Sequence, residues 1–174
     1  MLLSEHRSEP DPSSRRDGGT TTFPDPCELL TMYERILVPT DGAPGTERAI
    51  EEALDLAELS EGTVHALYVV DTRDYSTLPE SKWLALKSEF EERGETVVGE
   101  VADRAEARAV PVETAVERGL PHEAILQYAD ERDADVVVMG THARTGLNRF
   151  LIGSVTEKII RSAERPVLVV RLED

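Results

Sequence analysis

The chain has 174 residues, of which 40% are hydrophobic, and its formal net charge is −16. That length suits one domain around a single core, and no apolar run approaches the roughly 18 residues needed to cross a bilayer. So acidic a surface repels nucleic acid and anionic membranes, so we expect neither as a partner. The composition is typical of proteins from a salt-rich cytoplasm, where ionic strength screens self-repulsion.

The first 31 residues are predicted to form a disordered, acidic N-terminal tail. They contain SEPDPSSRRDGGTTTFPDP, which is rich in Pro, Ser, Asp and Gly and lacks apolar periodicity. Only Leu2 and Leu3 precede polar residues, so no apolar core of a secretory signal is present and we expect a cytoplasmic protein. The single cysteine, Cys27, excludes an internal disulfide and a cysteine-based zinc site. The folded domain is expected at residues 32–174.

From residue 33, short apolar runs alternate with segments of helical period. The apolar runs predict strands at RILVP (35–39), TVHALYVV (63–70), VETAV (112–116), DVVVM (135–139) and PVLVV (166–170). Several of these runs are apolar throughout instead of alternating. That pattern is typical of strands buried on both faces of a parallel sheet.

Helices are expected between these strands, at 44–60, 79–109, from Pro121 onward, and at 154–163. Pro44 and Pro121 suit the first turn of a helix, whereas Gly94 is expected to interrupt the second one. The third helix is predicted to bury Ala124, Ile125, Tyr128 and Ala129. The alternating order predicts a doubly wound α/β domain.

Ligands of such sheets bind beyond the carboxyl ends of the strands, where the strand order reverses. Three loops therefore matter: PTDGAPG after the first strand, VVDTRDY after the second and MGTHARTG after the fourth. Asp41 is a candidate ligand or cap, and Asp71 a turn former. The chain has no G-x-x-x-x-G-K-[ST], no G-x-G-x-x-G after the first strand, no H-x-x-x-H and no G-x-S-x-G. A P-loop NTPase, an ordinary NAD(P) dehydrogenase, a metalloprotease and a serine hydrolase are disfavoured.

The segment after the fourth strand has features of an anion site. Gly153 and Ser154 open a helix, whose first N–H groups and positive dipole end attract anions. Residues 140–165 hold five basic side chains against two acidic ones, a local excess of three positive charges. A phosphate ligand fits this pattern. The alternative is a capping box, in which Ser154 and Glu157 satisfy the first donors of the helix without a ligand.

Blocks along the chain resemble the universal stress protein family. They are ILVPTDG, ALYVVD, GLPHEAIL, ADVVVMGTHARTG and RPVLVVR, and the resemblance covers about residues 33–172. The family has a loop of the form G-x-x-G, nine residues, then G-[ST]. This chain has Gly140, Ala143 and Gly153-Ser154 at those positions.

The resemblance implies a Rossmann-like fold: an open, twisted, parallel five-stranded sheet in the order 3-2-1-4-5, with helices on both faces. It also implies a homodimer joined along the last strand, and ATP, accompanied by Mg²⁺, as a ligand. In ATP-binding members the first-strand loop surrounds ribose and adenine, a second-strand main chain reads adenine, and the fourth-strand loop cradles phosphates and ribose. The matching positions are Pro39, Thr40, Asp41, Val69, Gly140, Ala143, Arg144, Gly153, Ser154, Val155 and Thr156.

Ala143 departs from the family pattern, which has glycine there. If the position requires a left-handed backbone, alanine costs ~1–2 kcal/mol, and binding weakens about tenfold. Two functions follow: an ATP-binding stress protein that acts through its bound state, and a protein-interaction module without a nucleotide. No positioned general base is visible, so at most slow ATP hydrolysis is expected.

Overall fold

The structure is a computed structural model that describes residues 32–75, 79–141 and 152–171. The predicted tail at residues 1–31 lies outside the described residues. So do Ala143 and Arg144, two of the positions matched to the family's nucleotide site.

The strands form one five-stranded sheet in the order β3-β2-β1-β4-β5, and every neighbouring pair is parallel. The strands are β1 (Arg35–Pro39), β2 (Thr63–Asp71), β3 (Val112–Gly119), β4 (Val136–Gly140) and β5 (Val167–Val170). The predicted doubly wound domain and the strand order implied by the family are confirmed. Because the order reverses between β1 and β4, the switch point lies between these two strands.

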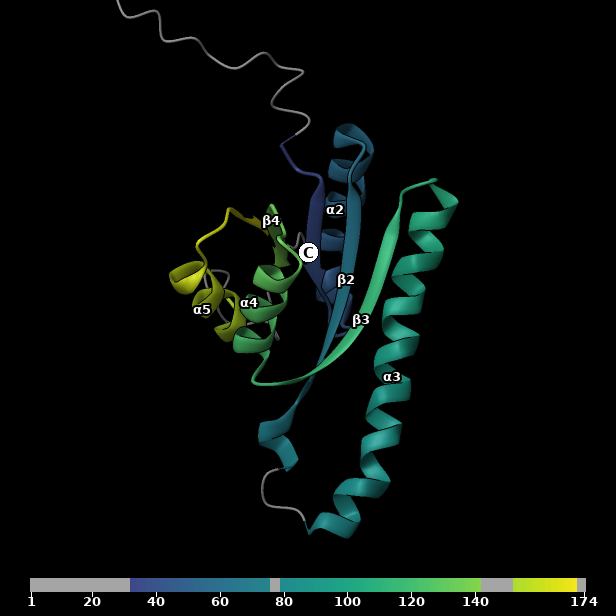
Figure 1. Ribbon diagram of the computed structural model, residues 1–174, viewed down its shortest axis with the longest axis vertical. Coiled ribbons are helices and arrows are strands. Elements are labelled where there is room, and N and C mark those ends of the chain that lie inside the picture. The colour runs from purple at the N-terminus through teal and green to yellow at the C-terminus, as the bar shows by residue number, and fades with distance from the viewer. Residues whose placement is uncertain (1–31, 76–78, 142–151, 172–174) are drawn as a thin grey trace, which may run out of the picture.

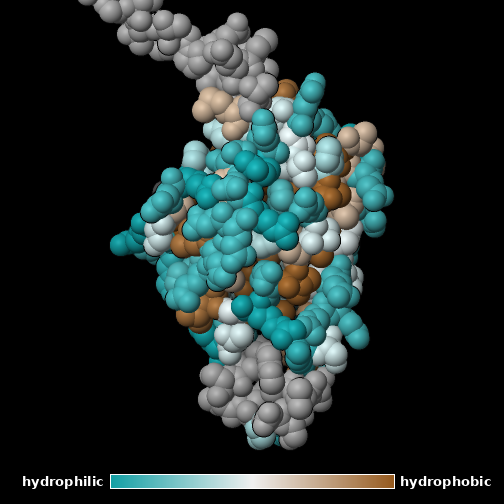
Figure 2. Space-filling model, viewed as in Figure 1, coloured by the Kyte–Doolittle hydropathy of each residue, from teal (hydrophilic) through white to brown (hydrophobic). Residues whose placement is uncertain are grey.

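Helices cover both faces of the sheet (Figure 1). They are α2 (Glu47–Ser60) and α3 (Glu80–Ala107) on one face, α4 (Pro121–Glu131) and α5 (Ser154–Ser162) on the other, with short 3-10 turns η1 (Pro44–Thr46) and η2 (Thr72–Tyr75). Within the described ranges, none of these helices is both long enough and apolar enough to span a bilayer. Much of the face shown in Figure 2 is hydrophilic.

Two hydrophobic cores follow from the alternation of side chains along each strand. Ile36 and Val38 of β1 pack toward α2 and α3, whereas Leu37 packs toward α4 and α5. Val137 and Met139 of β4 join the second core. A strand that contributes to both cores has no polar face, which explains the apolar runs in the sequence.

Three details differ from the predictions. Helix α3 continues through Gly94, because this glycine lets the helix lie close to the sheet: a Cβ there would be 2.8 Å from Tyr68 Cδ1 and 2.9 Å from Val116 Cγ1. Pro44 opens the turn η1, and α2 begins only at Glu47. On α4, Ala124 is partly exposed, although the other three predicted core residues are buried.

Candidate functional site

The carboxyl ends of β1 and β4 lie side by side at the switch point. The first-strand loop (residues 40–46) follows β1, and it rests against the last residue of β4. A Cβ on Gly140 would be only 2.6 Å from the carbonyl oxygen of Gly45, which is too close for any other residue type without movement of the backbone. Gly140 is therefore required for packing between the two loops, whether or not a ligand approaches it.

The N-terminus of α5 is fastened to the same place. Thr156, which is 3% exposed, donates its Oγ1 hydrogen to the carbonyl oxygen of Gly140 at 3.1 Å. Ser154, the first helical residue, is exposed. The first turn of α5 thus lies at the carboxyl edge of the sheet, beside the end of β4.

The capping box, which the sequence left open as an alternative to a phosphate site, does not form among the described residues. Gly153 occupies the N-cap position with an extended backbone, and no side chain among the described residues caps this helix end. Glu157 instead accepts a hydrogen bond from Arg161 Nη2 at 2.8 Å, one turn further along the helix. The first N–H groups of a helix lack partners within it. Because no described side chain caps them, these N–H groups are the candidate donors for an anion.

The main chain of Val69 faces the space beyond the end of β1. Pro39 is level with Leu67 in the β1–β2 pairing, and Thr40 N–H donates to the Leu67 carbonyl oxygen at 2.9 Å. Residues two apart in a strand direct their N–H and C=O groups to the same side. Val69 therefore directs its N–H and C=O groups toward the β1 side, where β1 has already ended.

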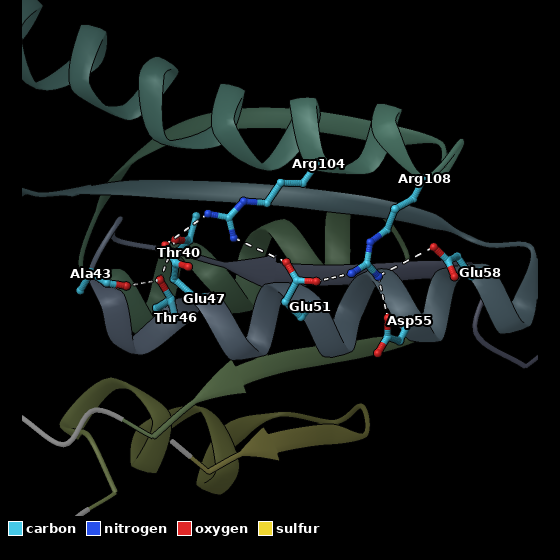
Figure 3. Close-up of polar contacts among 9 residues, drawn as sticks. All are labelled: Thr40, Ala43, Thr46, Glu47, Glu51, Asp55, Glu58, Arg104 and Arg108. Atoms are coloured by element: carbon cyan, nitrogen blue, oxygen red, sulfur yellow. Dashed lines mark hydrogen bonds and ion pairs between the residues drawn. The ribbon is translucent and has the colours of Figure 1, made fainter. Parts of the chain in front are cut away.

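The side chains of Thr40 and Asp41 form hydrogen bonds within the first-strand loop. Thr40 is labelled in Figure 3. Asp41 Oδ1 accepts a hydrogen bond from Ala43 N–H at 3.0 Å, which is the geometry of an Asx turn. Thr40 Oγ1 accepts from Gly42 N–H at 3.2 Å and lies 3.0 Å from Thr46 Oγ1. A ligand at this loop would therefore meet mainly its backbone.

The end of β2 also carries a closed polar contact. Arg73 donates to Asp71 through its backbone N–H and its Nε, each at 3.0 Å from Oδ1. The side-chain hydrogen bond from Arg73 lowers the pKa of the Asp71 carboxyl group. The prediction that Asp71 forms a turn is confirmed.

Two of the five basic side chains counted in the sequence, Arg161 and Arg165, lie away from the start of α5. Arg165 donates to Asp130 Oδ1 at 3.1 Å, beside the beginning of β5, and Arg161 is paired with Glu157. Arg161 lies seven residues after Ser154, about 10 Å along the helix axis. The two arginines of the preceding loop lie outside the described residues. Among the described residues, the attraction for an anion therefore comes mainly from the helix end itself.

A ladder of ion pairs joins α3 to α2 behind the first-strand loop (Figure 3). Arg104 contacts Glu47 at 3.2 Å and Glu51 at 3.6 Å, and Arg108 contacts Glu51 and, at 2.6 Å, Asp55. The hydrogen bond with Asp55 raises the pKa of Arg108. Next to this ladder is a small pocket, lined by residues that include Thr40, Thr46, Glu47, Val97 and Arg104. It lies on the face covered by α2 and α3, so it is separate from the start of α5 on the other face.

Two residues of the first-strand loop escaped the sequence reasoning. Gly42 has a φ of +71°, and a Cβ there would be 2.7 Å from Val97 Cγ2, so both conformation and space require glycine. Its place in PTDGAPG signalled a turn but not this contact. Thr46 is buried and bonded to Thr40, which no local pattern indicates.

In the described ranges, no three His, Cys, Asp or Glu side chains are grouped so that they could hold a metal ion. Mg²⁺ usually binds through one or two carboxylates together with phosphate oxygens of a ligand, so this finding does not bear on a Mg²⁺ ion that arrives with a nucleotide.

Comparisons with known proteins agree on one family. The sequence model of the Universal stress protein family matches residues 32–171. Universal stress protein MJ0531 of Methanocaldococcus jannaschii is 37% identical over 141 residues, which cover 80% of this chain and 83% of that protein. Universal stress protein MJ0577 of the same organism is 30% identical over 158 residues, which cover 82% of this chain and 98% of that protein.

Solved structures share the fold. The structure of MJ0577 matches with a TM-score of 0.74 at 31% identity, over 82% of this chain and 99% of that one. A universal stress protein from Arabidopsis thaliana, solved with AMP bound, matches with a TM-score of 0.61 at 17% identity, over 80% of this chain and 92% of that one.

Proposed function

Because the chain belongs to the universal stress protein family, we propose that it binds an adenine nucleotide, ATP with Mg²⁺, at the carboxyl edge of the sheet. The observation that carries the proposal is the N-terminus of α5. Thr156 anchors it beside Gly140, and no described side chain caps it. In its bound state the protein would act in the stress response as a regulator, with at most slow hydrolysis.

The residues present fit such a ligand. The N–H groups of the first turn of α5, at residues 153–156, would hold phosphate, and Arg144 of the preceding loop would approach it. Val69, whose main-chain groups face beyond β1, would pair with adenine. The backbone at residues 39–41 would lie along the ribose and adenine. The nucleotide would supply the negative charge that the helix end lacks.

The Arabidopsis protein shows that a protein of this fold holds AMP. At 17% identity that likeness concerns the fold alone, so the proposal for this chain depends on its own residues. The strongest of these are the uncapped start of α5 and the main chain of Val69, since the side chains of Thr40 and Thr156 are already bonded within the protein.

Calorimetry with Mg-ATP tests the proposal directly. We expect one ATP per subunit, and heat-denatured protein should release material absorbing near 260 nm if nucleotide copurifies. A clean supernatant together with no heat of binding would reject nucleotide binding.

A second function, a protein-interaction module without a nucleotide, is supported by one observation. The side chains of Thr40, Asp41 and Thr156 all bond within the protein, so the crevice does not need a ligand to satisfy them. Ala143→Gly separates the two functions. A large gain in ATP affinity would indicate that the native site has decayed. A measurable wild-type affinity that the substitution leaves unchanged would favour a working site.

We further propose that the protein is a homodimer joined along β5. This strand is an edge of the sheet, and Leu168 is 41% exposed on it. Pairing with a second copy would cover the open edge. Pro166 and Val170 direct their carbonyl groups to β4, so Val169 N–H points to the free edge.

Val169→Pro therefore removes an outward donor without breaking the bonds to β4. We expect this variant to be a folded monomer by light scattering and circular dichroism, whereas Val169→Ala stays a dimer. A wild-type monomer, or a dimer that survives the proline, would contradict the arrangement.

A further inference from the structure

A buried chain of hydrogen bonds closes the first-strand loop (Figure 3). Gly42 N–H donates to Thr40 Oγ1 at 3.2 Å, and Thr40 Oγ1 lies 3.0 Å from Thr46 Oγ1. Thr46 Oγ1 donates to the carbonyl oxygen of Ala43 at 2.9 Å. The two threonines are 6% and 7% exposed, so water cannot easily replace the bond between their hydroxyl groups.

The direction of the chain follows from the number of protons. A hydroxyl group has one hydrogen to donate, and a carbonyl oxygen can only accept. With the Thr46 hydrogen donated to Ala43, the bond between the two hydroxyl groups is donated by Thr40. The chain therefore runs one way, from Gly42 N–H through Thr40 and Thr46 to the Ala43 carbonyl. Reversing one bond would leave another group unpaired.

Thr46 adjoins the contact between the first-strand loop and the end of β4. Thr46 follows Gly45, whose carbonyl oxygen lies against Gly140. Gly140 in turn accepts the hydrogen bond from Thr156 that anchors α5. A displacement of the loop at Thr46 would therefore shift both the first-strand backbone and the support of α5.

From this geometry we infer that Thr46 is a positioning residue for the proposed adenine nucleotide site. The inference rests on the proposed function, and it concerns a residue that need not touch the ligand. Its hydroxyl group keeps the backbone of residues 40–43 in one arrangement before the nucleotide arrives. A loop that is ordered only on binding would lower affinity by the entropy lost in ordering it.

Thr46→Val keeps the shape of the side chain and removes the hydroxyl group, so Thr40 loses its acceptor, while the Ala43 carbonyl oxygen keeps only the backbone N–H of Thr46. We expect Mg-ATP to bind at least about tenfold more weakly to this variant. Thr46→Ser restores the hydroxyl group and should bind within about twofold of wild type. The matched control is Val110→Ala, a buried residue outside this loop, which should lower stability without changing affinity. If Thr46→Val fails to fold, Thr46→Ala removes the same hydroxyl group with a smaller side chain.

Amide hydrogen exchange of the nucleotide-free protein gives an independent measurement. Gly42 N–H should exchange at least about tenfold faster in Thr46→Val than in wild type, and Thr46→Ser should restore protection. If wild type does not bind Mg-ATP but exchange behaves in this way, the proposed function fails and the role of Thr46 in fixing the loop stands. The inference is overturned if Gly42 exchanges equally in all variants, or if Thr46→Val binds Mg-ATP as tightly as wild type.

Discussion

The first-strand loop and the start of α5 lie at the same edge of the sheet, on either side of the end of β4, but their polar groups are used in opposite ways. In the loop, Thr40, Asp41 and Thr46 bond to one another or to nearby backbone groups. At the start of α5, Gly153 is the N-cap and no described side chain covers the first N–H groups. The polar side chains of the first-strand loop are hydrogen-bonded without a ligand, whereas the first N–H groups of α5 are left for one by the described side chains.

This difference shows what a family motif can and cannot specify. Residues from both regions match the family's nucleotide positions, yet their side chains have different duties. Thr40 and Thr156 hold the scaffold, whereas the backbone of α5 offers the donors. Substitutions that alter the scaffold should therefore change stability first, and substitutions at the exposed helix start should change binding first.

Gly140→Ala should produce the largest change in stability, because it disrupts the contact between the first-strand loop and the end of β4. Its Cβ would be 2.6 Å from the Gly45 carbonyl oxygen, and a backbone neighbour cannot rotate away. We expect the free energy of unfolding to fall by about 1–3 kcal/mol in urea titrations. The control is Gly99→Ala in α3, where nothing lies within 4 Å of the new Cβ. That variant should gain about 0.5–1 kcal/mol. Equal effects of the two substitutions would contradict the close contact at Gly140.

Ser154→Asp sharpens the comparison by separating stability from binding. A carboxylate in the first turn of α5 should stabilise the helix by about 0.3–1 kcal/mol, because it complements the helix dipole. The same charge should repel phosphate and weaken Mg-ATP binding about fivefold or more. Ser154→Asn introduces a side chain of the same shape as Asp but without the charge, and it serves as the control in thermal unfolding and calorimetry. If Asp and Asn bind Mg-ATP equally well, phosphate does not lie at this helix end.

His65 differs from both regions, because it is buried and one of its ring nitrogens has no hydrogen-bond partner among the described residues. It is 4% exposed, its Nδ1 has no hydrogen-bond partner among the described residues, and Glu113 lies 3.7 Å away. Burial lowers the pKa of His65 below its ordinary value of 6.5. Arg132 and Arg35 act in the same direction, and Glu113 opposes them. Tyr128 of α4 packs edge-on to the imidazole ring.

A lowered pKa means that the folded state favours neutral His65. Its contribution to stability is complete above pH 6.5 and is lost as the pH falls from there through the folded-state pKa. We expect the free energy of unfolding to fall more between pH 8 and about pH 5 in wild type than in His65→Gln. The other histidines are present in both proteins, so their effects cancel. Parallel pH profiles would contradict a lowered pKa.

Arg108→Gln should have the smallest effect, because the ladder that it breaks is exposed to solvent, unlike the buried hydroxyl chain. The variant should melt at a slightly lower temperature than wild type in dilute buffer. Molar KCl should reduce this difference, since salt screens exposed ion pairs. Thr46→Val should melt below wild type by the same amount in both buffers. A difference for Arg108→Gln that does not change with salt would show that the ladder acts through packing.

Most of the fold could be predicted from local patterns. The apolar run at residues 35–39 coincides with β1, because a strand buried on both faces has no polar side. Pro121 marks the first turn of α4, and the expected fourth helix matches α5 to within one residue. The strand order came from the resemblance to the family, since periodicity does not record which strands are neighbours.

The sequence by itself determined the elements, the alternation of the two cores and the family, because these depend on residues near one another in the chain. Only the tertiary structure decided that Gly94 continues a helix, that Gly153 and not Ser154 caps α5, and that Arg165 lies at the opposite end of the sheet. It also joined Thr40 to Thr46 and brought Gly45 against Gly140. Contacts of this kind depend on how close two backbones come, and that distance is set by packing across the whole sheet.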